Sequence, residues 1–137
     1  MCGIAGYIGK FPPDLDHLKQ TSKILDHRGP NGEGFYAHKF QDNHVALVHR
    51  RLSIIDLDDR SNQPFIYNGT VLVFNGEIYN YLEIRRNLEE IGHIFKTKGD
   101  TEVLIHALCE WGQNALDKLE GMWAFAWYNE KQGTLIL

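Results

Sequence analysis

The chain has 137 residues, of which 43% are hydrophobic and 23% charged, and its formal net charge is -4. This length suits one globular domain with a single core, and the acidic balance argues against a nucleic-acid-binding surface, which is normally basic. The chain has neither the roughly 18-residue apolar run of a membrane-spanning helix nor the basic and apolar regions of a secretion signal.

The first half of the chain predicts strands around one helix and two loops. A helix is expected after Asp14, whose carboxylate can cap it. HRGPNGEG at 27–34 is rich in Gly and Pro and predicts a loop, and DDRSNQPF at 58–65 predicts another. Apolar runs predict strands at 3–9, 34–40 and 44–57, the last passing into a loop.

The second half predicts strands and amphipathic helices. The strand in TVLVF is expected to stop at Asn75 and Gly76, and Gly92 is expected to end a helix in a left-handed conformation. The helices are expected at 78–91, 100–112 and 114–121. The remaining strands are expected at 93–97, 122–129 and 134–137, with a hairpin turn at 130–133.

Two features of these elements bear on the overall architecture. Hairpin strands mixed with amphipathic helices predict sheets with helices packed on them. The chain ends on the apolar strand TLIL without a polar tail, which would leave an unpaired strand edge. We therefore expect the chain to be a fragment of a longer protein.

The chain contains two cysteines, Cys2 and Cys109. Two cysteines do not make a disulfide scaffold, so we expect a reducing, cytoplasmic location. The histidines are scattered and no Cys-x-x-Cys pair is present, so no metal site is predicted. Cys109 lies in a predicted helix and is expected to be structural.

Cys2 stands directly behind the initiator methionine, where removal of Met1 would give it a free α-amino group. That amine has a pKa of about 7.7–8.0, so it can act as the general base for the thiol of the same residue. Taken alone, the position of Cys2 favours the alternative, a tolerated small apolar residue.

The FNGE stretch offers the donors that a nucleophile attacking a carbonyl requires. The side-chain amide of Asn75 and the backbone N–H of Gly76 can stabilise an oxyanion, and glycine permits a close approach. An ordinary Asn-Gly turn is the alternative, and the pattern alone leaves both open.

Seven motifs together resemble one family. They are MCGIAG, HRGP, HRRLSIID, QPF, NGEIYNY, GDTE and LEGMWAFA, and they occur in the family's order from residue 2 to residue 127. The chain resembles the glutaminase domain of class II glutamine amidotransferases, and within these the glutamine-hydrolysing asparagine synthetase B type.

The resemblance implies an α+β fold, the N-terminal-nucleophile hydrolase sandwich of two antiparallel sheets between helical layers. Residues 1–137 would form an incomplete glutaminase domain, truncated at its C-terminal end. An ATP-dependent synthetase domain would follow residue 137, and ATP and Mg²⁺ would belong to that domain. No cofactor and no metal are expected in this chain.

The resemblance also implies roles for individual residues. Cys2 would attack glutamine, while Asn75 and Gly76 would stabilise the oxyanion. Arg51 would bind the α-carboxylate, a task that suits a planar guanidinium. The residues expected to complete the glutamine site are Leu52, Ile54, Glu77 and Asp100, the last binding the α-ammonium beside Gly99.

Four charged residues near the site have structural alternatives. Asp100 stands where a helix N-cap belongs, and a carboxylate can serve both roles. Glu77 can instead complement the dipole of a helix as a first-turn acid. We expect Arg28 to be a buried structural arginine that pairs across its loop, and Arg50 to be supporting or solvent-facing.

The function implied by the resemblance is hydrolysis of glutamine through a Cys2 thioester. The ammonia would feed ATP-dependent amidation of aspartate to asparagine in the full-length enzyme. The expected partners are glutamine and a synthetase domain of the same full-length chain, and no nucleic acid or membrane is expected. The resemblance is also compatible with a homodimer. Two alternatives remain open: another acceptor, as in surface polysaccharide synthesis, or a non-catalytic module that keeps the fold.

Overall fold

The computed structural model describes residues 2–53 and 59–137 of the protein. The strands are β1 (Gly3–Gly9), β2 (Gly32–Phe40), β3 (Asn43–Arg51), β4 (Phe65–Tyr67), β5 (Thr70–Ile78), β6 (Gly121–Asn129) and β7 (Thr134–Ile136). The α-helices are α1 (Leu15–Ile24), α2 (Tyr81–Glu90) and α3 (Asp100–Trp111). Short 3₁₀ helices are η1 (Asp26–Arg28), η2 (Asp59–Ser61) and η3 (Gly112–Lys118).

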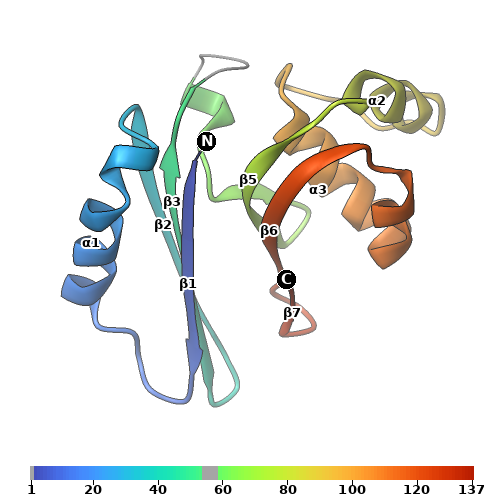
Figure 1. Ribbon diagram of the computed structural model, residues 1–137. Helices are drawn as coiled ribbons and strands as arrows, with labels where there is room; N and C mark the ends of the chain where they lie inside the picture. The colour runs from blue at the N-terminus through green and yellow to red at the C-terminus, as the bar shows by residue number, and fades with distance from the viewer. Residues whose placement is uncertain (1, 54–58) are drawn as a thin grey trace.

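The strands form two antiparallel sheets that lie between helical layers (Figure 1). One sheet has the strand order β1-β3-β2 and the other the order β4-β5-β6-β7. Helix α1 covers the outer side of the three-stranded sheet, and α2 and α3 cover that of the four-stranded sheet (Figure 1). The predicted α+β sandwich is confirmed.

Strand β5 is buried on both faces, which accounts for its continuous apolar run. Leu72 and Phe74 belong to the core beneath α2 and α3. Val71 and Val73 alternate with them and pack between the two sheets, against residues that include Val45 of β3.

The inner face of β3 changes from apolar to polar along the strand. Val45 and Leu47 pack in the layer between the sheets. His49 and Arg51 follow at the same period of two, so they belong to the same face, and both are buried. This alternation places a cation at the end of the inter-sheet layer.

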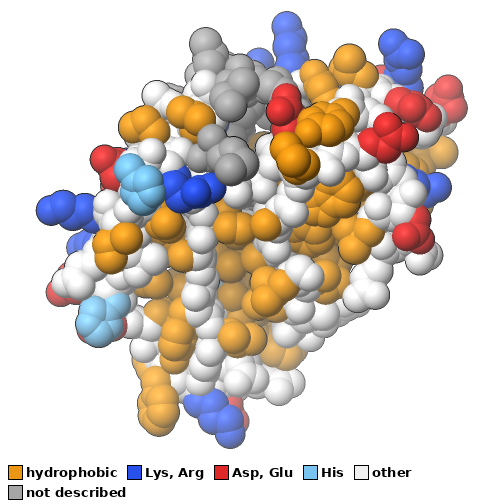
Figure 2. All heavy atoms as spheres, in the orientation of Figure 1, with side chains coloured by type: hydrophobic (Ala, Val, Ile, Leu, Met, Phe, Trp, Pro, Cys, Tyr) orange, Lys and Arg blue, Asp and Glu red, His pale blue; other side chains and the backbone are white. Residues whose placement is uncertain are grey.

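An apolar groove runs between β1 and β7 on the face shown in Figure 2. It is lined by Ile4, Ala5, Gly6, Tyr7, Ile8, Leu47, Val73, Phe125, Ala126, Leu135 and Leu137. Strand β7 lies at the edge of its sheet and pairs with β6. In the described part of the chain, no helix has the length and apolarity needed to cross a membrane.

Three local predictions agree with the structure. The carboxylate of Asp14 caps α1 by accepting hydrogen bonds from the backbone N–H groups of Asp16 (2.8 Å) and His17 (3.2 Å). Gly92 follows α2 with a φ of 100°. Cys109 is free of disulfide bonding and packs against the core beneath the helices.

The predicted end of the strand at Asn75 and Gly76 is wrong. Strand β5 runs on to Ile78, and β6 pairs with it over this stretch, with Asn75 opposite Ala124 and Ile78 opposite Gly121. The neighbouring strand lies more than 40 residues away in the sequence. A local Asn-Gly signal therefore could not reveal that the ladder continues.

The predicted strand at 93–97 is also wrong. The backbone N–H groups of Lys96 and Thr97 donate to the carboxylate of Glu102, so they are not available to a neighbouring strand. The predicted loop at 58–65 contains η2 and the start of β4, and the predicted helix at 114–121 is the 3₁₀ helix η3.

Two buried histidines predict a pH dependence of stability. Burial lowers the pKa of His49 to about 4, and burial also lowers the pKa of His106 to about 4. Between the ordinary value of 6.5 and about 4, the unfolded chain binds protons that these folded side chains do not. The free energy of unfolding should therefore fall as the pH drops from 6.5 to 4, by up to about 1.4 kcal/mol per pH unit for each histidine.

Urea denaturation at pH 7 and pH 4.5, followed by tryptophan fluorescence, measures this loss. In His49→Gln the amide can still donate to the carbonyl of Phe74, but it does not titrate. The loss between the two pH values should therefore be smaller in His49→Gln than in the wild type. The exposed His17→Gln serves as the control, and an equal loss in both variants would contradict the assignment to His49.

Candidate active site

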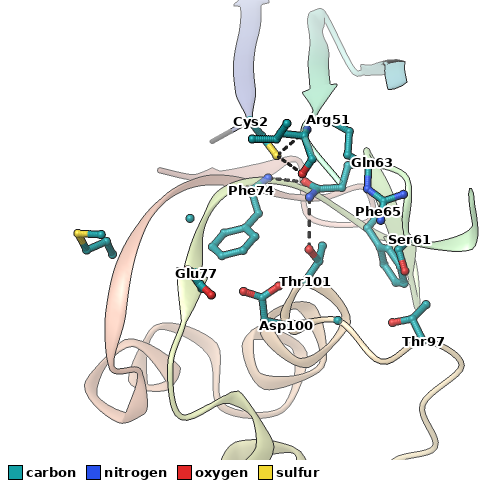
Figure 3. A pocket seen from close by; sticks show the side chains of 14 residues that line it. Cys2, Arg51, Ser61, Gln63, Phe65, Phe74, Glu77, Thr97, Asp100 and Thr101 are labelled. Atoms are coloured by element: carbon teal, nitrogen blue, oxygen red, sulfur yellow. Dashed lines mark hydrogen bonds between the residues drawn. The ribbon is translucent and has the colours of Figure 1, made fainter. Parts of the chain in front are cut away.

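A cavity opens where the ends of β1 and β3 meet β5 and the start of α3 (Figure 3). Six predicted site residues line it: Cys2, Arg51, Leu52, Gly76, Glu77 and Asp100. These residues are far apart in the sequence, and antiparallel pairing of β1 with β3 brings the first three together. Ile54, also predicted for the site, lies outside the described residues, as does Met1.

Cys2 is held on two sides, by the backbone of Leu52 and by the side chain of Arg28. Its Sγ accepts a hydrogen bond from the backbone N–H of Leu52 (3.4 Å) and lies 3.8 Å from the carbonyl oxygen of Leu52. The Nε of Arg28 donates to the carbonyl of Cys2 (3.0 Å). Arg28 is half-buried and its partner is the backbone of the candidate nucleophile, so the predicted buried pairing across its own loop is wrong.

The two neighbouring arginines at the end of β3 point to opposite faces and have different partners. Arg51 is buried, lines the cavity, and donates from Nη1 to Oδ1 of Asn62 (2.8 Å). Arg50 donates to the carbonyl of Gly29 (3.0 Å) and pairs with Asp26 and Glu33. Arg50 therefore supports the loop, which was one of its two predicted roles.

Two carboxylates lie across the cavity from Arg51 (Figure 3). Asp100 is buried, and its Oδ2 accepts from the backbone N–H of Ile78 (3.1 Å). Burial raises the pKa of Asp100, and hydrogen bonds from backbone N–H groups oppose that shift. Glu77 is exposed at the cavity.

The predicted position of Asp100 within its helix is wrong by one residue. Gly99 occupies the N-cap position of α3 with an extended backbone, and Asp100 is the first helical residue. A carboxylate in the first turn still gains from the positive end of the helix dipole. The side chain of Asp100 thus lines the cavity while it accepts a hydrogen bond from the N–H of Ile78 at the edge of β5.

The edge of β5 that faces the cavity is lined by polar partners. The N–H of Phe74 donates to Oε1 of Gln63 (2.6 Å), and its carbonyl accepts from Nε2 of His49 (3.3 Å). The N–H of Ile78 points to the same edge, toward Asp100. Backbone groups two residues apart in a strand point the same way, so the N–H of Gly76 also faces this edge.

Position 76 requires a glycine because strand β6 packs closely against it. A Cβ atom there would lie 2.3 Å from the carbonyl oxygen of Met122 and 2.6 Å from Cα of Trp123. The residue has an ordinary strand conformation, so the constraint is the close approach of β6 and not an unusual φ. Its bare backbone N–H lies at the cavity wall.

A family model described as a glutamine amidotransferase domain matches residues 1–137. The chain belongs to the glutamine amidotransferase domain family. It is 41% identical to asparagine synthetase [glutamine-hydrolyzing] 1 of Bacillus subtilis, over 98% of this chain and 22% of that relative. It is 34% identical to putative asparagine synthetase [glutamine-hydrolyzing] 2 of Methanocaldococcus jannaschii, over 98% of this chain and 29% of the relative.

Solved structures agree with this family. Glutamine phosphoribosylpyrophosphate amidotransferase from B. subtilis superposes with a TM-score of 0.74 and 25% identity, over 95% of this chain and 35% of that one. The predicted N-terminal-nucleophile sandwich is thereby confirmed. The chain spans only 22% and 29% of the two curated relatives, so it corresponds to a part of each.

Asn75 does not line the cavity of this glutamine amidotransferase domain. It belongs to the face of β5 that carries Val71 and Val73, which packs toward the sheet containing β1. Its Oδ1 is buried and has no hydrogen-bond partner among the described residues. Its oxyanion role stays a prediction.

Gln63 is a cavity residue that the sequence analysis missed. It accepts from Phe74, and its Nε2 donates to Oγ1 of Thr101 (3.3 Å), so one buried amide joins β5 to the start of α3. The QPF motif was the signal available. Within the described residues, no group of three His, Cys, Asp or Glu side chains is arranged to hold a metal ion.

Proposed function

We propose that this domain hydrolyses glutamine to glutamate and ammonia, with Cys2 as the nucleophile. The observation that carries the proposal is a single cavity lined by the Cys2 thiol, the Arg51 guanidinium and the Asp100 carboxylate. A thiol beside one cation and one anion suits a free amino acid with a reactive side-chain amide.

The charges set the orientation of the substrate. Arg51 binds the α-carboxylate of glutamine through charge-assisted hydrogen bonds, and Asp100 with Glu77 binds the α-ammonium. The side chain then extends toward Cys2 and the N–H of Gly76. Because each charged group of the substrate meets its opposite, the amide carbon is held beside the sulfur.

The reaction proceeds in two halves. The α-amine of Cys2, freed by removal of Met1, takes the thiol proton, and the thiolate attacks the amide carbon. The ammonium formed on Cys2 gives this proton to the departing nitrogen of the substrate. Ammonia leaves, and a glutamyl thioester remains. The amine then activates water, which cleaves the thioester and releases glutamate. The N–H of Gly76 at the cavity wall stabilises the oxyanion in both halves. The amide of Asn75, on the face of β5 directed at the sheet that contains β1, is the second proposed donor.

In the full-length protein, the ammonia feeds ATP-dependent amidation of aspartate to asparagine by a further domain. The names of the two relatives support this assignment. ATP and Mg²⁺ belong to that domain in this proposal, and glutamine is the only ligand of the present one. A cytoplasmic location and a homodimer stay predictions.

The proposal is tested by incubating the full-length protein with glutamine and measuring glutamate and ammonia. Mass spectrometry should show that Met1 is absent and that a glutamine-like diazo-ketone labels Cys2. Asparagine should form only when aspartate and ATP are added. Absence of glutamate release from protein that lacks Met1 would refute the proposal.

Arg51→Ala should raise the KM for glutamine about 10- to 100-fold and change kcat much less. The lost hydrogen bonds to a charged group are worth about 1.5–3 kcal/mol, and they hold the end of the substrate remote from the reaction. Steady-state kinetics measures the change. A glutamine analogue without the α-carboxylate is the control, because the substitution should leave its kinetics unchanged.

A further inference from the structure

One wall of the cavity is formed by an irregular segment between α2 and α3. Thr97 and Gly99 of this segment line the cavity, and Asp100 follows directly. Residues 94–97 make no backbone–backbone hydrogen bond with the rest of the described chain. Side chains must therefore determine the position of this wall.

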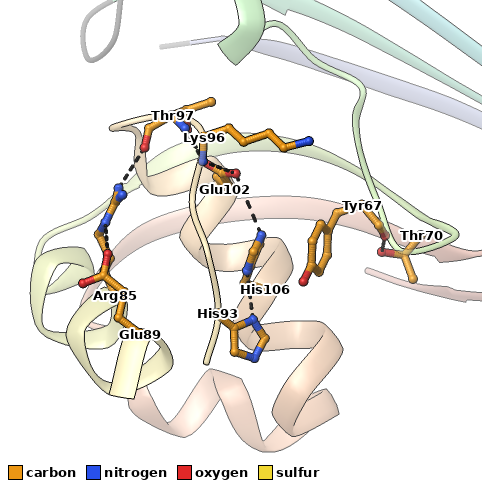
Figure 4. A network of polar contacts seen from close by, with 9 residues as sticks. All are labelled: Tyr67, Thr70, Arg85, Glu89, His93, Lys96, Thr97, Glu102 and His106. Carbon is orange, nitrogen blue, oxygen red and sulfur yellow. Dashed lines mark hydrogen bonds and ion pairs between the residues drawn. The ribbon is translucent and has the colours of Figure 1, made fainter. Parts of the chain in front are cut away.

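Glu102 holds the segment from below (Figure 4). Its carboxylate is buried, with the residue only 3% exposed, and it accepts from the N–H of Lys96 (2.9 and 3.1 Å). It also accepts from the N–H (2.6 Å) and the hydroxyl (2.7 Å) of Thr97. One side chain of α3 thus satisfies the donors of two consecutive residues.

Arg85 holds the same segment from α2 (Figure 4). Its Nη1 donates to the carbonyl of Thr97 (2.8 Å), and its guanidinium carbon lies 4.5 Å from the ring centroid of Phe95. Its Nε donates to Glu89 (2.9 Å), which fixes the orientation of the guanidinium. The backbone of Thr97 is therefore held at its N–H by one helix and at its carbonyl by another.

Packing beneath the segment supports the same arrangement. The ring of Phe95 stacks on His106, with centroids 4.4 Å apart, and Tyr67 stacks on His106 at 3.8 Å. Nε2 of His106 lies 3.9 Å from the carboxylate of Glu102. These contacts pack Phe95 of the segment against α3.

We propose that Glu102 and Arg85 are positioning residues for glutamine. They hold Thr97 and Gly99 in place and so fix the end of the cavity where Asp100 receives the α-ammonium. This inference rests on the proposed function. Because this end is remote from the attacked amide, a displaced segment weakens substrate binding and leaves the chemical step little changed.

The test uses Glu102→Gln and Arg85→Lys in the full-length protein. In Glu102→Gln, the side-chain amide places its NH₂ group against the backbone donors. In Arg85→Lys, the charge is kept but the fork that reaches both Thr97 and Glu89 is lost. Each variant should raise the KM for glutamine about tenfold, which equals about 1.4 kcal/mol, with kcat within about twofold. Arg86→Lys, on the exposed face of α2, should leave both constants unchanged.

Hydrogen exchange measured by mass spectrometry on peptides covering 93–99 gives a readout independent of activity. Exchange at Lys96 and Thr97 should become faster in Glu102→Gln, and exchange in α3 should stay as in the wild type. If the wild type releases no glutamate, the proposed function fails, but the exchange data still test the positioning.

Two results of the exchange experiment would overturn the inference. One is unchanged exchange at 93–99 in both variants, and the other is faster exchange without any rise in KM. If the buried Glu102→Gln substitution prevents folding, Arg85→Lys decides, because its side chain is 21% exposed and lies at the surface of α2. A fall in kcat with KM unchanged would also contradict it.

Discussion

Cys2→Ala should lower kcat for glutamine hydrolysis on the order of 10⁶-fold, the effect of removing the nucleophile of a covalent hydrolase. The substitution removes the sulfur that lies beside the N–H of Leu52 and leaves the α-amine, Arg51 and Asp100 in place. Glutamine should therefore still bind. Glutamate release gives the rate, and isothermal titration with glutamine gives the dissociation constant.

Cys109→Ala is the matched control, because it removes the other thiol of the chain. Cys109 is half-buried, lies 3.4 Å from the hydroxyl of Thr70, and packs against the core beneath the helices. Burial raises the pKa of its thiol, which makes it a poor nucleophile. Cys109→Ala should therefore retain the kcat of the wild type. Glutamate release by Cys2→Ala above 1% of the wild-type rate would contradict the role of Cys2.

The sequence predicted those parts of the site that depend on local chemistry. Cys2 was found from its place behind Met1, and the roles of Arg51 and Asp100 were implied by the resemblance of their motifs to the family. The cavity contains all three, although they are separated by about 50 residues each. The apolar and polar periods of the strands and helices predicted sheets with helices packed on them, and the resemblance implied the sandwich of two sheets.

The parts that failed depend on partners distant in the sequence. The continuation of β5 past Gly76 is determined by β6, and the loss of a strand at 93–97 is determined by Glu102. The role of Gln63 requires both Phe74 and Thr101 to be near, which only the folded chain shows. A pattern read along one segment does not contain these contacts.

Asn75→Ala should lower kcat about 10²- to 10³-fold with little change in KM, the usual effect of removing one oxyanion donor. The side chain of Asn75 is on the face of β5 directed at the sheet that contains β1, and its Oδ1 has no partner in the described chain. Loss of its amide should therefore cost few contacts within the protein. In Asn75→Ala, only the N–H of Gly76 would remain of the two proposed donors to the negative charge that develops on the amide oxygen of the substrate.

Asn80→Ala separates this effect from a loss of structure. Asn80 donates to the carbonyl of Lys118 (2.9 Å) and accepts from the N–H of Glu120 (3.0 Å), so its removal should lower stability and leave kcat unchanged. The kcat of Asn75→Asp should fall at least as far as that of Asn75→Ala, because a carboxylate repels the oxyanion. Steady-state kinetics and thermal unfolding of the three variants distinguish the two roles. An unchanged kcat in Asn75→Ala would leave Gly76 as the sole assigned donor, and Asn75 would then serve only the packing of β5.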